Sequence, residues 1–62
     1  MAVNLLETIN YKNLEELQTL ALPDNSEIQR QMREKYPDKR LTFQTVMHYN
    51  SGKYCLNVFE FV

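Results

Sequence analysis

The only residues in this 62-residue sequence that could form a base–thiol pair are its single histidine and its single cysteine, His48 and Cys55. An imidazole activates a thiol only within hydrogen-bond reach, and a third group must orient the imidazole. His48 and Cys55 lie on either side of a predicted turn, so strand register decides whether they meet. Because a cysteine inside a strand usually serves as a small apolar filler, we predict no catalytic residue and no enzyme.

Metal and phosphate sites also lack the residues that they need. A zinc site takes three or four ligands, and one His with one Cys cannot supply them within one chain. A phosphate-binding loop needs several glycines, whereas Gly52 is the only glycine in the chain. We therefore predict no metal and no cofactor.

Charge is distributed unevenly along the chain. Residues 1–29 contain five acidic residues and one basic residue, whereas residues 30–62 contain six basic and three acidic residues. The two parts therefore carry −4 and +3, which agrees with the net charge of −1. The cations of one short segment could orient an acidic partner or contact nucleic acid, and they are Arg30, Arg33, Lys35, Lys39 and Arg40.

Acidic residues are interleaved with this basic segment. Glu27, Glu34 and Asp38 stand three or four residues from a cation, which is the spacing of ion pairs on a solvated helix. A net charge of −1 also opposes the long-range attraction on which nucleic-acid binding relies. A small dimeric nucleic-acid-binding regulator that uses residues 30–40 is therefore our alternative prediction.

Composition places the chain among small globular domains. The apolar fraction of 44% and the charged fraction of 24% are ordinary values. A chain of this length forms one domain, residues 1–62, with little core to spare for a deep cleft. No apolar run exceeds three residues, so we expect no membrane-spanning helix and no signal peptide. One cysteine allows no internal disulfide, which favours a reducing compartment, the cytoplasm.

Capping patterns predict helices in the first half of the chain. Asn4 and Glu7 have the spacing of a capping box, which predicts a helical turn over residues 5–10. A second box, at Asn13 and Glu16, precedes an apolar stripe at Leu14, Leu17, Leu20 and Ala21. The pattern leaves open whether residues 4–22 form one bent helix or two pieces.

A second helix is predicted from Glu27 to about Lys35. Pro23 ends the preceding helix, and Asp24 has capping-box spacing to Glu27. Its apolar stripe is narrow, and Pro37 stops it at Tyr36. We therefore expect a surface helix with one buried edge.

The last third of the chain reads as a β-hairpin. From Arg40 the apolar residues recur at every second position, which predicts a strand. Asn50-Ser51-Gly52 forms the turn, and residues Lys53 to Val62 form the second strand. The predicted fold is therefore α+β: two N-terminal helices, then an antiparallel hairpin (ααββ). Because two strands alone are marginal, we expect the sheet to be extended by dimerisation.

This predicted order of elements, in about sixty residues, resembles the small phage repressors of the Cro type. The resemblance implies DNA binding by a helix-turn-helix. The chain departs from that family at Leu22-Pro23-Asp24-Asn25, where a tight turn between the two helices would be required.

Hairpin register decides which residues face outward. A three-residue turn pairs Tyr49 with Lys53 and gathers the phenylalanines beneath the helices, whereas a two-residue turn sets Phe43 opposite Glu60. We favour the first, because cross-strand aromatic pairs stabilise sheets and the second buries an acid. The outward, partner-binding face is then Val46, His48, Tyr54, Leu56, Val58 and Val62.

A partly apolar outer face indicates an interaction surface. We expect a non-enzymatic protein-binding module that forms a homodimer or docks on a larger protein through its hairpin, by added-strand pairing along the last strand. Its size and its Met start are typical of phage or mobile-element inhibitors and regulators. Acid on the polar face of the first helix argues against a membrane surface as partner.

Overall fold

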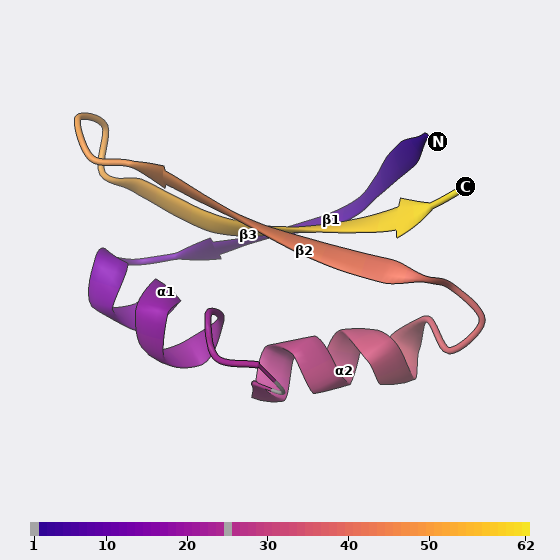
Figure 1. The fold of residues 1–62 in the computed structure, drawn as a ribbon. Helices are drawn as coiled ribbons and strands as arrows, with labels where there is room; N and C mark the ends of the chain where they lie inside the picture. Colours follow the sequence, from indigo (N-terminus) through magenta and orange to yellow (C-terminus); the bar gives the residue numbers. More distant parts are fainter. Residues whose placement is uncertain (1, 25) are drawn as a thin grey trace.

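Three strands and two helices make up the part of the protein that the structure describes. The computed structural model describes residues 2–24 and 26–62. The elements, in chain order, are β1 (Val3–Tyr11), α1 (Leu14–Leu20), α2 (Glu27–Lys35), β2 (Leu41–His48) and β3 (Lys53–Phe61) (Figure 1). The sheet is antiparallel with strand order β1-β3-β2, so the last strand of the chain is the middle one.

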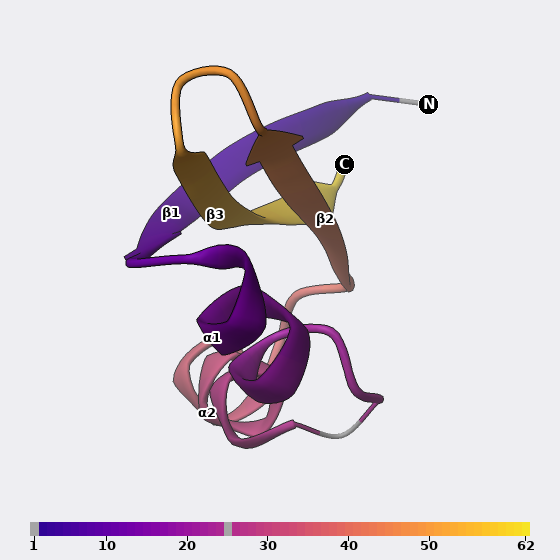
Figure 2. The ribbon, with the colours of Figure 1, turned by 90° about the vertical axis from the view of Figure 1, so that its left-hand side faces the viewer.

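The two helices lie on the same side of the sheet. Figure 1 shows both of them beneath the strands, and the view along the sheet in Figure 2 shows the opposite side bare. The molecule therefore has two layers, and one face of its sheet is not covered by its own helices.

The predicted ααββ order is wrong, because residues 3–11 form a strand. Asn4 and Glu7 have capping-box spacing, but a helix of about six residues has little stability of its own. As a strand, the same segment pairs with β3 along its length and packs Ile9 and Tyr11 against the core. The sheet thus gains its third strand from its own chain, and residues 4–22 are a strand followed by α1.

The resemblance to Cro-type repressors rested on the order ααββ and does not hold for β1-α1-α2-β2-β3. Residues Leu22, Pro23 and Asp24 separate α1 from α2, as the sequence indicated. Asn25, the last residue of that interruption, lies outside the described residues.

The helix ends follow the local sequence closely. The predicted Asn13 cap of α1 is confirmed, because Asn13 Oδ1 accepts from Glu16 N at 2.9 Å. The reciprocal bond differs from that of a capping box: Glu16 Oε2 accepts from Lys12 N at 2.9 Å, one residue before the cap. The bounds of α2 are confirmed as well. Its cap, however, is Ser26, whose Oγ accepts from Gln29 N at 3.4 Å, and not Asp24.

The hairpin register differs from both registers considered above. Gly52 has a positive φ of 65°, as predicted for the turn. The loop nevertheless contains four residues, since His48 pairs with Lys53 and Val46 pairs with Cys55. Loops of four residues built on a type I turn are common in hairpins. Compared with the favoured register, β3 is shifted by one residue. Side chains of β3 that were expected toward the helices therefore lie on the opposite side of the sheet, and the others lie toward the helices.

The core lies between the middle strand and the helices. Leu17 and Ala21 of the first helical segment pack on Leu56 of β3. Partly buried residues from all five elements surround them, namely Ile9, Tyr11, Leu14, Ile28, Phe43 and Tyr54. The even-numbered residues of β3 therefore form the floor of the core, whereas Cys55, Phe59 and Phe61, which were expected there, lie on the other face.

Candidate protein-binding surfaces

The structure divides the predicted partner-binding face between the two sides of the sheet. Leu56 and Val58, exposed by 1% and 0%, lie beneath the helices, and Tyr54 packs against the same core. Val46 and His48 lie on the uncovered side, and Val62 is exposed at the end of the chain. The six residues do not form one surface, because the register shift moved those of β3 to the core.

The uncovered side of the sheet, which we call the open face, carries a different apolar group. Across β1 and β3, Val3 pairs with Phe61 and Leu5 pairs with Phe59. Val3, Leu5 and Phe61 remain 49%, 56% and 40% exposed. This group lies at the end of the sheet where the chain begins and ends (Figure 1).

Sequence reasoning missed Val3 and Leu5 because it assigned their segment to a helix. A signal for the strand was present: Val3, Leu5, Ile9 and Tyr11 occupy alternate positions, as strand residues on one side do. The structure interrupts this alternation with a register shift between Leu5 and Glu7, which turns Ile9 and Tyr11 toward the helices.

The open face is almost free of charge. Among the described strand residues whose register places them on this face, Lys53 beside the turn is the one acidic or basic residue other than His48. Arg40, which directly precedes β2 and pairs with Phe61, adds one more cation at the opposite end of the face. Polar contacts there are neutral, such as the bond of 2.8 Å from Thr8 Oγ1 to Asn57 Oδ1. The acids of the strands, Glu7 and Glu60, point instead toward the helix side, where lysines bind them.

His48 and Cys55 lie on this same face but are not directly opposed. Val46 is the partner of Cys55, and Lys53 is the partner of His48, so the two side chains are diagonal neighbours. Cys55 is a free, buried thiol, whereas His48 is exposed. In the described part of the chain, no three His, Cys, Asp or Glu residues form a group that could hold a metal ion.

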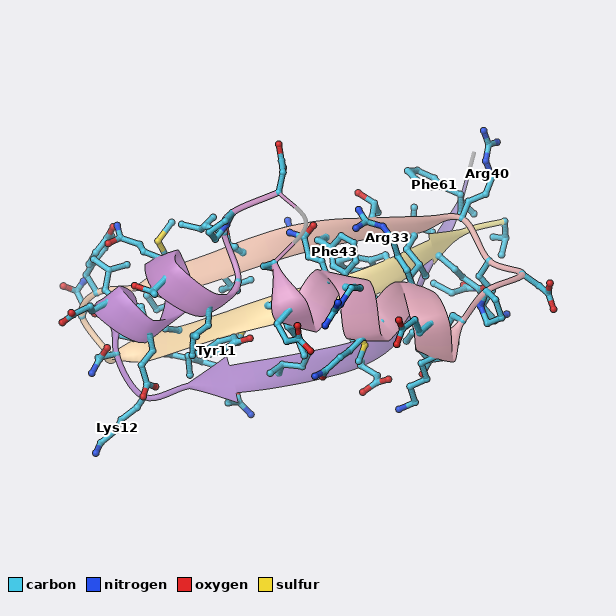
Figure 3. The ribbon with its side chains drawn as sticks, turned by 90° about the horizontal axis from the view of Figure 1, so that it is seen from below. Tyr11, Lys12, Arg33, Arg40, Phe43 and Phe61 are labelled. Atoms are coloured by element: carbon cyan, nitrogen blue, oxygen red, sulfur yellow. The ribbon has the colours of Figure 1, made fainter. Side chains whose placement is uncertain are left out.

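The basic segment is largely engaged in contacts within the molecule. Arg30 pairs with Glu27, Lys35 Nζ lies 2.7 Å from Glu7 Oε2, and Lys39 Nζ lies 2.7 Å from Glu60 Oε2. The guanidinium of Arg33 lies over the Phe43 ring, 5.4 Å from its centroid (Figure 3).

Arg40 stands apart from this group. It directly precedes β2 and lies beside Phe61, whose N–H donates to the Arg40 carbonyl at 3.0 Å (Figure 3). The five predicted cations therefore do not form one free patch.

The ion pairs also join the helix layer to the sheet. Hydrogen bonds from Lys35 and from the Tyr36 hydroxyl, the latter 2.7 Å long, lower the pKa of Glu7. The hydrogen bond to Glu7 likewise raises the pKa of Lys35. On the same face of the sheet, the hydrogen bond from Lys39 lowers the pKa of Glu60. These carboxylates stabilise the fold in their ionised form.

Acid should therefore weaken the fold in part through Glu7. Its folded-state pKa lies below the ordinary value of 4.5, so its contribution to stability is present above that pH and is lost as the pH falls through the lowered pKa. We expect the urea midpoint to fall less between pH 5 and pH 3 in Glu7→Gln than in the original protein. Glu15→Gln, at an exposed residue of α1, is the control and should leave the pH dependence unchanged. An unchanged pH dependence in Glu7→Gln would contradict this role.

Comparison with known proteins gives no match: no protein-family model, no curated protein and no solved structure matches this chain. Of the two helices within residues 2–24 and 26–62, neither is long and apolar enough to cross a membrane.

Proposed function

We propose that this protein is a non-enzymatic protein-binding module whose open face is covered by a second copy of the chain. The observation that carries the proposal is the exposure of Val3, Leu5 and Phe61 on a sheet face with almost no charge. In a small folded protein, a contiguous apolar patch of this kind is typical of a protein interface. Most of the open face belongs to the hairpin, so docking through the hairpin remains part of the proposal. Val46 and His48 belong to the docking surface, whereas the buried Leu56 and Val58 do not.

A second copy suits this face because it carries no acidic residue among the described strand residues and its cations Lys53 and Arg40 lie at its two ends. When the face meets itself across a two-fold axis, no cluster of like charges opposes the contact. Two bare sheet faces pack about 10 Å apart, as they do in β-sandwiches. Three strands about 4.8 Å apart and roughly 30 Å long give a footprint of about 400 Å² per copy, below the ~800 Å² of a standard interface. We therefore expect a weak dimer that depends on concentration.

A reducing compartment, the cytoplasm, suits this proposed function, because the one cysteine of the chain, Cys55, is a buried free thiol.

The alternative function, nucleic-acid binding by residues 30–40, has weaker support. Three of its five cations already pair with carboxylates, and Arg33 lies against Phe43.

Sedimentation velocity tests the dimer. We expect the average mass of the original protein to rise from monomer toward dimer between about 10 µM and about 1 mM, the range of a small interface. Leu5→Asp, which places a charge in the exposed patch, should remain monomeric throughout. Leu20→Asp is the matched control, since Leu20 is similarly exposed, at 50%, but lies on α1. A monomeric original protein, or a Leu5→Asp variant that dimerises equally well, would show the proposal to be wrong.

A further inference from the structure

The two outer strands of the sheet differ in how their edges are protected. Natural edge strands usually carry charges, prolines or bulges that prevent other strands from pairing with them. β1 has both Glu7 and a register irregularity between Leu5 and Glu7. β2, from Leu41 to His48, contains no Asp, Glu, Lys, Arg or Pro and pairs with β3 without interruption. The free edge of β2 is therefore the unprotected one.

The register identifies the main-chain groups at this edge. Phe61 N donates to Arg40 O at 3.0 Å, so Arg40 and Phe61 form a hydrogen-bonded pair. In an antiparallel ladder such pairs alternate, so the even-numbered residues of β2 direct their N–H and C=O groups toward β3. The odd-numbered residues direct theirs outward, and they are Leu41, Phe43, Thr45 and Met47.

A hollow of about 320 Å³ adjoins β2 on the helix side. Phe43 and Thr45 line it from the strand, and Leu22 and Asp24 line it from the connection between α1 and α2. Gln29, held by a bond of 3.1 Å from its Nε2 to Ala21 O, lines it from α2. The walls of the hollow are thus mainly polar, with Leu22 and Phe43 as apolar parts and Asp24 as the one acidic side chain. It lies next to a strand edge whose outward N–H and C=O groups have no strand partner within the described part of the chain.

We infer that the edge of β2 is a strand-addition site for an extended segment of another protein, and that the hollow takes a lysine or arginine side chain of this segment. A strand added to β2 would bond to the outward groups of Phe43 and Thr45. The residues of the added strand that pair with Phe43 and Thr45 would place their side chains on the helix side, next to the hollow. The Phe43 ring already carries the guanidinium of Arg33, so a long cationic side chain would lay its methylene stem against Leu22 and direct its charge to Asp24.

A second copy of the chain suits this edge poorly. Antiparallel self-pairing that used all four outward residues would be centred on Gln44 and would set Phe43 opposite Thr45 of the second copy. Asp24 lies beside these same residues in each copy, so the pairing would bring two carboxylates and two connecting segments together. An extended segment carries no such obstruction. The strand-addition site is thus a different surface from the open face and does not depend on the proposed dimer.

The experiment uses synthetic octapeptides in which threonine and valine alternate, with blocked ends. One peptide carries a central lysine and its match carries glutamate at the same position. We expect amide chemical-shift changes confined to residues 41–47 and the adjoining hollow, with the lysine peptide bound at least about tenfold more tightly. Asp24→Lys should reverse this preference, so that the glutamate peptide binds more tightly. If Asp24 had only a structural role, the substitution would not reverse the preference.

Two controls separate main-chain pairing from other binding. N-methylation of the peptide amides that face β2 removes their donors without any change to the protein, and binding should be lost. Thr45→Pro should also abolish binding but keep the fold, because the Thr45 N–H points outward. Leu5→Asp should bind the lysine peptide as the original protein does, whatever its effect on dimerisation.

The results that would overturn the inference are equally specific. If neither peptide shifts the amides of β2 at about 1 mM, the edge does not accept a strand. Binding that survives N-methylation would mean that main-chain pairing is not the mode of recognition. Equal binding of the lysine and glutamate peptides would remove the role of Asp24 and the hollow.

Discussion

Replacing Leu56 with aspartate should unfold the protein. Leu56 is 1% exposed, stands between Ile9 and Thr45 in the middle strand, and contacts the core residues of α1. A carboxylate there would lose its water without gaining a partner, which costs several kcal/mol in addition to the lost packing. A 62-residue domain has about 3–9 kcal/mol of stability in total. The far-UV circular dichroism of Leu56→Asp should therefore be that of an unfolded chain in the absence of urea.

The matched control is Leu5→Asp, the same substitution at a residue that is 56% exposed on the open face. It should keep the far-UV spectrum of the original protein and a cooperative urea transition. If Leu56 instead faced outward toward a partner, the Leu56→Asp variant would keep its helix content and lose only its binding to that partner. That outcome would contradict the burial of the middle strand beneath the helices.

Replacing Leu17 with alanine should have the second-largest effect. Leu17 is fully buried and joins α1 to the sheet through its contact with Leu56 and the surrounding side chains. Truncation of a fully buried leucine costs about 3–5 kcal/mol, because the lost apolar contact is accompanied by a cavity. We expect the urea midpoint to fall until the transition has almost no folded baseline at 25 °C.

Leu20→Ala is the control for this change, on the same helix. The sequence placed both leucines on one apolar stripe, but Leu20 is 50% exposed in the structure. Its truncation should cost less than about 1 kcal/mol, as expected for an exposed side chain. Equal destabilisation by the two substitutions would mean that α1 is rotated from the orientation described here.

The elements that could be predicted are those whose signals are local. The Asn13 cap set the start of α1, Pro23 lies in the segment that separates the two helices, and Pro37 follows the end of α2. The positive φ of Gly52 and the strands on either side of it also followed from neighbouring residues. In each case the deciding contact spans only a few residues.

The first strand and the face of the last strand were predicted incorrectly, because their deciding contacts are distant in sequence. Asn4 and Glu7 matched a helix start, but pairing with residues 54–61 determines the structure of their segment. The face of β3 depends on one residue of loop length, and its sequence has apolar residues on both sides: Leu56 and Val58 on one, Phe59 and Phe61 on the other. Either choice buries apolar area, so periodicity alone could not decide.

The sequence by itself thus determined a small α+β domain with two short helices, a glycine turn and a basic segment interleaved with acids. Only the tertiary structure decided that β3 is the middle strand, that Leu56 and Val58 belong to the core, and that the open face and the β2 edge are the exposed surfaces. The physical reason is that strand pairing is a non-local interaction. Its free energy depends on which segments meet and in which register, and neither is encoded within a few neighbouring residues.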